Sequence, residues 1–156
     1  MLIVAVVGSR KSGKTSIIEA LVRELSALGC RVAVVKHIHH EEFEFDVPGK
    51  DTWRAFHAGS VAVVGASSSR TLIGIRGTME LPALLRVVEE LSAPDLILLE
   101  GFSGELSDLS GVHVISMGGR NFALNDGELI CECRGPGDRD RAVSAVRALI
   151  GKCPHE

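Results

Sequence analysis

Residues 8–15, Gly-Ser-Arg-Lys-Ser-Gly-Lys-Thr, constrain the fold of this chain more than any other stretch. They match the phosphate-binding pattern G-x-x-x-x-G-K-[ST]. The apolar run at residues 2–7 predicts a strand directly before them, and apolar residues at helical spacing over 17–28 predict a helix after them. A strand, this loop and a helix in that order are what a phosphate loop requires, so we predict a nucleotide-binding protein.

The residue types in the loop indicate its chemistry. Glycines let the backbone curl around a polyphosphate, so that N–H groups and the positive end of the following helix face the phosphate oxygens. Lys14 would reach the β and γ phosphates, and Thr15 would supply a hydroxyl ligand to a phosphate-bound Mg²⁺. The predicted phosphate site comprises Gly8, Ser9, Arg10, Lys11, Ser12, Gly13, Lys14, Thr15 and Ser16.

An acid is expected opposite the loop. Residues 95–101, Asp-Leu-Ile-Leu-Leu-Glu-Gly, predict a buried strand that ends in Glu100. In P-loop proteins a carboxylate at the end of a neighbouring parallel strand holds Mg²⁺ across from the loop hydroxyl. We therefore predict Glu100 as a metal ligand, whereas Asp95 lies about 17 Å away at the other end of the strand and is too distant.

The remaining pattern predicts one α/β domain over residues 1–156. We expect the three-layer sandwich of P-loop NTPases: a mostly parallel sheet with helices on both faces, with antiparallel hairpins as additions. One such hairpin is expected at residues 60–76, and a terminal one around the turn Asn125-Asp126-Gly127. Further strands are expected at 32–35 and 112–117, and further helices at 48–59, 81–91 and 138–150.

Charge and cysteine content bear on the partners of the protein, its location and the state of its thiols. A net charge of −3 without a basic run argues against a nucleic-acid partner. The sequence has no signal-peptide pattern and no apolar stretch near the ~20 residues that span a membrane, so we expect no membrane contact and a cytoplasmic protein. We expect free thiols. Cys131 and Cys133, with Cys153 and His155, could imitate a metal site, but a C-x-C pair on a strand is more typical of packing.

Residues 36–51 follow the second expected strand, on the side of the sheet that holds the loop. Asp46 and Asp51 are predicted to respond to Mg²⁺ or phosphate, because Mg²⁺ takes one or two carboxylates beside phosphate oxygens. Three histidines beside several carboxylates leave metal binding, proton transfer and simple charge compensation open. These histidines are His37, His39 and His40.

Four stretches together resemble the molybdopterin-guanine dinucleotide biosynthesis protein B family, known as MobB. They are the phosphate loop and the runs Lys36-His37-x-His39-His40, Asp46-x-Pro48-Gly49-Lys50-Asp51 and Leu99-Glu100-Gly101-Phe102. The resemblance covers roughly the first two thirds of the chain. It implies a homodimeric, GTP-binding protein with weak GTPase activity that assists the partner enzyme attaching GMP to molybdopterin. Molybdopterin or its nucleotide is then a further ligand.

Carried over to this sequence, the resemblance places phosphate and Mg²⁺ at the loop, and Lys50 and Asp51 beside the nucleotide. For slow hydrolysis we expect Lys14 and Glu100 to stabilise charge and Asp46 to position water. Mg²⁺ ligands would be Thr15, Glu100 and Asp46. GTP follows from the resemblance alone; the base-reading signature N-K-x-D is absent from the sequence, so the residues do not exclude ATP.

Two other functions stay open at this stage. One is a GTP-dependent metallochaperone that uses His37, His39 and His40, and the other is an ATP-dependent ligase or kinase of the same architecture. A third possibility is a pure adapter without useful hydrolysis. No residue can be assigned as an arginine finger, which favours a weak GTPase over a metabolic catalyst. The chain also departs from the family, because Ser103 stands where relatives tend to have lysine and the segment 104–110 is short.

Overall fold

The computed structural model describes residues 1–39, 43–44, 46–119 and 122–151. The chain divides into two compact units, one made of Met1–His37 and Leu81–Glu156 and the other of Ile38–Glu80. We expected a single domain, because no linker-like composition marks either junction. Among the described residues, no helix is long and apolar enough to cross a membrane.

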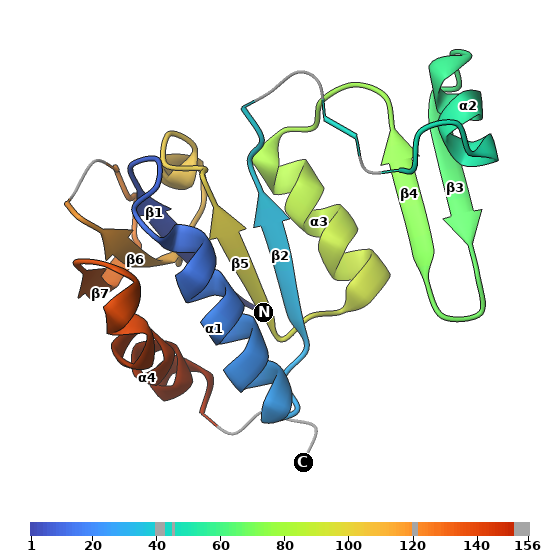
Figure 1. Ribbon diagram of the computed structural model, residues 1–156. Coiled ribbons are helices and arrows are strands. Elements are labelled where there is room, and N and C mark those ends of the chain that lie inside the picture. The colour runs from blue at the N-terminus through green and yellow to red at the C-terminus, as the bar shows by residue number, and fades with distance from the viewer. Residues whose placement is uncertain (40–42, 45, 120–121, 152–156) are drawn as a thin grey trace. The chain divides into compact units, whose positions relative to one another are not determined.

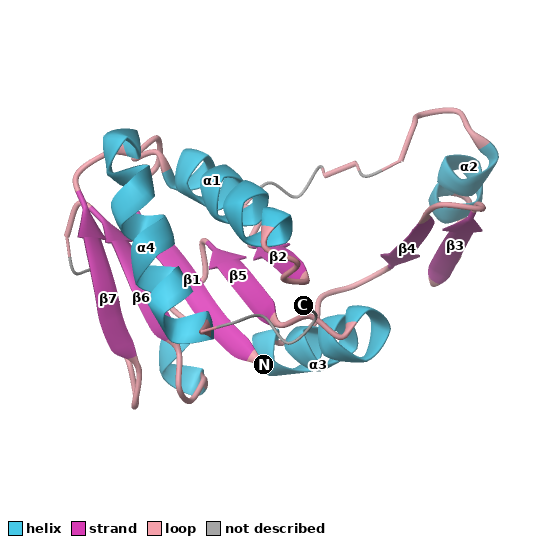
Figure 2. Ribbon diagram, turned by 90° about the horizontal axis from the view of Figure 1, so that it is seen from below, coloured by secondary structure: helices cyan, strands magenta, loops and turns pink. Residues whose placement is uncertain are grey.

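The first unit is built on a five-stranded parallel sheet with strand order β2-β5-β1-β6-β7. Helices α1 and α4 cover one face of this sheet and α3 covers the other (Figures 1 and 2). This confirms the predicted mostly parallel, three-layer fold. The strands are β1 (Leu2–Gly8), β2 (Val32–Lys36), β5 (Leu96–Glu100), β6 (His113–Met117) and β7 (Glu128–Cys133); the helices are α1 (Lys14–Ala27), α3 (Leu81–Ser92) and α4 (Arg139–Ile150).

Alternation along the central strands produces the two cores. On β1, Val4 and Val6 join the cluster beneath α1 and α4, whereas Ala5 and Val7 join the cluster beneath α3. All five residues of β5 are buried, as expected for a parallel strand covered on both faces. The continuous apolar runs in the sequence therefore mark the centre of the sheet, and β1 brings the phosphate loop to its carboxyl edge.

The predicted terminal hairpin is wrong. β7 pairs in parallel with β6, and the described residues before it, 122–127, form no strand. Asp126 Oδ1 accepts a hydrogen bond of 2.6 Å from the Gly111 N–H, and the Glu128 N–H donates to the Val112 carbonyl oxygen at 2.9 Å. The turn is thus tied to the start of β6, so β7 begins level with β6 and runs in the same direction.

The second unit contains helix α2 (Asp51–His57) and the antiparallel pair β3 (Ala62–Ala66) and β4 (Thr71–Ile75). The hairpin is confirmed, but it forms a two-stranded sheet of its own. α2 covers one face, because Gly65 and Gly74 leave room for Thr52 and Phe56. Among the described residues of this unit none is fully buried, so it has only a thin core.

Candidate functional site

The phosphate loop depends on glycine at both ends. Gly8 has a φ of 151° and Gly13 a φ of 96°, values at which a side chain is strained. A Cβ on Gly8 would lie 2.6 Å from the Met117 carbonyl oxygen, because β6 runs directly beside the start of the loop. The backbone therefore turns sharply after β1 and enters α1 with the first N–H groups of the helix unpaired, which is the geometry that receives an anion.

The Lys14 ammonium lies over this loop. Its Nζ donates to the carbonyl oxygens of Gly8, at 3.0 Å, and Ser9, at 2.6 Å. Lys14 is also the first residue of α1, so the positive side chain and the positive end of the helix are close together. The loop thus presents concentrated positive charge.

Thr15 and Glu100 meet beside the loop. The Thr15 hydroxyl donates to Glu100 Oε1 at 3.3 Å across two elements that are 85 residues apart in sequence. Glu100 stands at the end of β5, in register with Val6 on β1, so its carboxylate reaches the first turn of α1. The pattern of an acid closing a buried strand predicted this pairing, and the structure brings the two side chains together.

This pair suits a hard divalent cation. A hydroxyl and a carboxylate oxygen are the ligand types that Mg²⁺ takes beside phosphate oxygens. Glu100 is buried, with only 7% of its surface exposed, so water screens its charge less than that of an exposed carboxylate.

Sequence reasoning missed Lys36 as a member of this site. Its Nζ forms an ion pair of 3.1 Å with Glu100 Oε1, and the two residues are register partners at the ends of β2 and β5. Half of the Lys36 side chain is exposed, against 10% for Glu100. The sequence does show a lysine and a glutamate, of opposite charge, at the ends of two apolar runs. These charges predict an ion pair only once β2 is known to lie beside β5.

The other predicted ligands lie in the second unit. The Asp46 carboxylate accepts hydrogen bonds from the Thr52 side chain and, at 2.7 Å, from the Val47 N–H, and these bonds lower the pKa of Asp46. Lys50 occupies the N-cap position of α2 and Asp51 begins the helix. A role for these three residues at the nucleotide therefore stays a prediction.

The histidine run is only partly described. His37 packs against Phe102 with ring centroids 5.3 Å apart, and His39 is exposed. His40 lies outside the described residues. Within the described ranges, no group of three or more His, Cys, Asp or Glu side chains is arranged to hold a metal ion.

The cysteines of β7 pack in the core. Cys131 and Cys133 are free and buried, with sulfur atoms 3.5 Å apart, and burial raises the pKa of Cys133 to about 12. A Cys133 thiol that stays protonated fits packing better than metal binding. Cys153 and His155 lie outside the described residues. The expectation of free thiols is wrong for Cys30, which is disulfide-bonded.

A glycine-bounded loop between β1 and α1, opposed by an acid at the end of the adjacent parallel strand, defines a P-loop nucleotide-binding fold. Within this class the chain belongs to the MobB family, described as molybdopterin guanine dinucleotide synthesis protein B, whose pattern it matches over residues 3–130.

Curated relatives of the chain are described as adapter proteins of the same biosynthesis. A molybdopterin-guanine dinucleotide biosynthesis adapter protein of Haemophilus influenzae is 37% identical over 105 residues, which are 66% of this chain and 58% of that protein. The adapter protein of Escherichia coli is 34% identical over 97 residues, 60% of this chain and 55% of that one. The chain thus matches little more than half the length of these relatives.

The fold is also that of solved MobB structures. The crystal structure of Bacillus subtilis MobB aligns with a TM-score of 0.64 at 25% identity, covering 93% of this chain and 98% of the other. The likeness covers a larger share of the chain than the family match over residues 3–130.

Proposed function

We propose that this protein binds GTP with Mg²⁺ at the phosphate loop and serves as an adapter in the attachment of GMP to molybdopterin. The observation that carries the proposal is the contact between the Thr15 hydroxyl and the Glu100 carboxylate beside the loop. Family membership and the adapter proteins among its relatives support the pathway. GTP as the nucleotide is part of the proposal.

The residues of the site divide the work of binding a triphosphate. Loop N–H groups and the Lys14 ammonium would neutralise the phosphate oxygens, while Thr15 and Glu100 would hold the cation. Bound Mg²⁺ would offset further charge on the terminal phosphates. Lys36 would keep the Glu100 carboxylate oriented, because its ammonium is paired with Oε1, the oxygen that also accepts from Thr15.

Hydrolysis by such a site is expected to be slow. Arg10 is an exposed residue of the loop itself, and we assign no arginine finger. P-loop proteins that lack such a charge turn over orders of magnitude more slowly than stimulated ones. A weak GTPase that engages a partner enzyme, the one that transfers GMP to molybdopterin, fits this chemistry better than a metabolic catalyst.

We expect Glu100→Gln to weaken GTP binding about tenfold in Mg²⁺ and to leave it unchanged or tighter in EDTA. The substitution removes charge but keeps shape, and Lys36 is exposed enough to be solvated when it loses its partner. Calorimetric titrations with GTP in the two buffers measure this. Glu24→Gln on the exposed side of α1 is the control. An equal loss in both buffers would contradict the metal assignment.

The second unit supports a homodimer. The face of its hairpin that α2 leaves uncovered is apolar: Val64 pairs with Ile73 across the strands, and 60% and 44% of their surfaces are exposed. Ala62 and Ile75 extend the same face. A two-stranded sheet with a thin core is marginal by itself. A second copy presenting the same face would bury both, and we propose it as the dimer surface.

On this basis Val64→Asp should give a monomer at concentrations where the unchanged protein sediments as a dimer. A carboxylate in the centre of the apolar face would be desolvated without a partner on association. Leu91→Asp is a matched control, because Leu91 is 66% exposed on α3 in the other unit. Analytical ultracentrifugation provides the readout, and a Val64→Asp protein that remains dimeric would place the interface elsewhere.

A further inference from the structure

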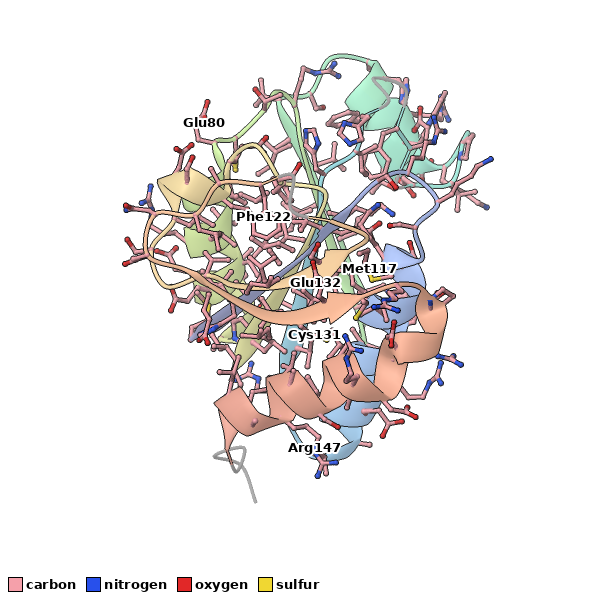
Figure 3. The ribbon with its side chains drawn as sticks, turned by 90° about the vertical axis from the view of Figure 1, so that its left-hand side faces the viewer. Glu80, Met117, Phe122, Cys131, Glu132 and Arg147 are labelled. Carbon is pink, nitrogen blue, oxygen red and sulfur yellow. The ribbon has the colours of Figure 1, made fainter. Side chains whose placement is uncertain are left out.

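A polar cavity of about 520 Å³ lies at the carboxyl ends of β6 and β7. Its walls are Gly118 and Gly119 after β6, residues 132–134 at the end of β7, and Asp138 and Arg141 at the start of α4. Figure 3 looks onto this side of the first unit and labels Met117 on β6 and Glu132 on β7. Most of these lining residues lie beyond residue 130, where the family match ends.

The cavity adjoins the phosphate loop. Gly8, at the start of the loop, is in register with Met117, and Met117 is in register with Cys133. The ends of β1, β6 and β7 therefore stand side by side at one edge of the sheet. A Cβ on Gly13 would lie 3.1 Å from Pro136 Cδ, so the segment between β7 and α4 touches the far end of the loop as well.

The arrangement of the strands gives a bound triphosphate a direction. Thr15 and Glu100, which mark the metal and terminal-phosphate end, lie on the β5 side of β1. β6 and β7 lie on the opposite side of β1. A nucleotide whose terminal phosphates point toward β5 must extend its sugar and base toward β6 and β7, where this cavity is.

Asp138 lines the cavity, and its Oδ1 is the less firmly bonded of its two carboxylate oxygens. Its Oδ2 accepts the Arg134 N–H at 2.7 Å, and this bond is the main cause that lowers the pKa of Asp138, which is thus ionised at neutral pH. Its side chain makes no capping bond to α4, although it stands at the N-cap position. Oδ1 forms an ion pair of 3.4 Å with Arg141 Nη1, and the Gly135 N–H also bonds to the carboxylate. The aspartate is therefore anchored mainly through Oδ2, and the long contact leaves Oδ1 able to accept a further hydrogen bond.

Arg141 supplies donors beside this acceptor. Its guanidinium donates from Nη2 to the Glu132 carbonyl oxygen and also bonds to the Cys131 side chain, and Nη1 is directed toward Asp138. An acceptor next to a donor fork matches guanine, whose N1–H and N2 amino group donate while O6 and N7 accept. Adenine presents an amino donor where guanine has O6 and lacks the 2-amino group, so it matches this pair poorly.

We propose that the cavity is a guanine subsite in which Asp138 Oδ1 accepts from the N1–H and 2-amino groups and Arg141 donates to O6 and N7. The subsite rests on the proposed binding of a nucleoside triphosphate at the loop. It gives the chain a means of choosing GTP over ATP without the N-K-x-D signature, and it makes Asp138 the residue that determines specificity.

The test exchanges the acceptor for a donor. In Asp138→Asn the amide oxygen can keep the bond to the Arg134 N–H, so the NH₂ group takes the place of Oδ1. We expect GTP affinity to fall about tenfold and affinity for xanthosine triphosphate, which has a carbonyl at position 2, to rise by about the same factor. Asp140→Asn, an exposed change of the same charge on α4, should leave the preference unchanged. Titration calorimetry with GTP, XTP, ITP and ATP measures each affinity.

The outcomes separate the subsite from the phosphate site. A reversal of the GTP to XTP preference in Asp138→Asn, confined to that variant, supports the subsite, and a misfolded protein could not produce a gain in XTP binding. If the unchanged protein binds GTP but Asp138→Asn keeps the same preference, or if GTP and ATP bind equally, the subsite is overturned and the loop assignment stands. If the unchanged protein binds none of these nucleotides, both are overturned.

Discussion

Lys14→Ala should weaken GTP binding about 100-fold or more, which takes it out of the range of a direct calorimetric titration. The Lys14 ammonium lies against two loop carbonyl oxygens, where it can bridge phosphate oxygens with charge-assisted hydrogen bonds. Alanine removes the charge while favouring the helix that starts at this residue. The variant should also fail to speed the attachment of GMP to molybdopterin by the partner enzyme.

Arg23→Ala is the control for this experiment. Arg23 is an exposed residue of the same helix, so its loss changes net charge equally without touching the loop. Far-ultraviolet circular dichroism should show that both variants retain their secondary structure. GTP bound by Lys14→Ala as tightly as by the unchanged protein would remove the phosphate assignment, and with it the proposed function.

Gly8→Ala should be the most destabilising small substitution at the site, costing about 3 kcal/mol or more of unfolding free energy. Its φ of 151° strains a side chain, and the new Cβ would lie 2.6 Å from the Met117 carbonyl oxygen and 2.7 Å from Met117 Cβ. Neither contact can be relieved by turning a flexible side chain. The start of the loop and β6 would have to separate.

Gly29→Ala isolates the backbone contribution. Gly29 also has a positive φ, 83°, but a Cβ there would meet nothing within 4 Å. Its cost should be about 1 kcal/mol, from conformation alone. Urea unfolding of the two variants, followed by circular dichroism, gives the difference. Equal losses of unfolding free energy would show that the close contact with Met117 does not contribute to the cost of Gly8→Ala.

The sequence was sufficient for features that depend on neighbouring residues. The phosphate loop, the strand before it and the helix after it follow from spacing within one stretch. Glu100 could be placed beside the loop, because an apolar run that ends in an acid indicates which end of the strand faces the loop. The parallel sheet follows from the alternation of strands and helices, since parallel neighbours need such crossovers.

Features that depend on spatial order were out of reach. Lys36 joins the site only because β2 lies next to β5, and nothing in either strand states that order. The direction of β7 depends on Asp126 binding the Gly111 N–H, although Asn-Asp-Gly alone indicates a hairpin turn. Asp138 begins the helix expected at residues 138–150, and its contacts with Arg134 and Arg141 become visible only in the structure.

In the sequence, the boundary between the two units directly follows two residues that are bonded to Glu100. The chain leaves the first unit after His37, whose N–H donates to the Glu100 carbonyl oxygen at 2.8 Å, and Lys36 one residue earlier holds the Glu100 side chain. Glu100 is thus bonded, through its main chain and its side chain, to the last two residues of the first unit before the chain enters the second. A change in the position of Glu100 would therefore move the last two residues before the crossing.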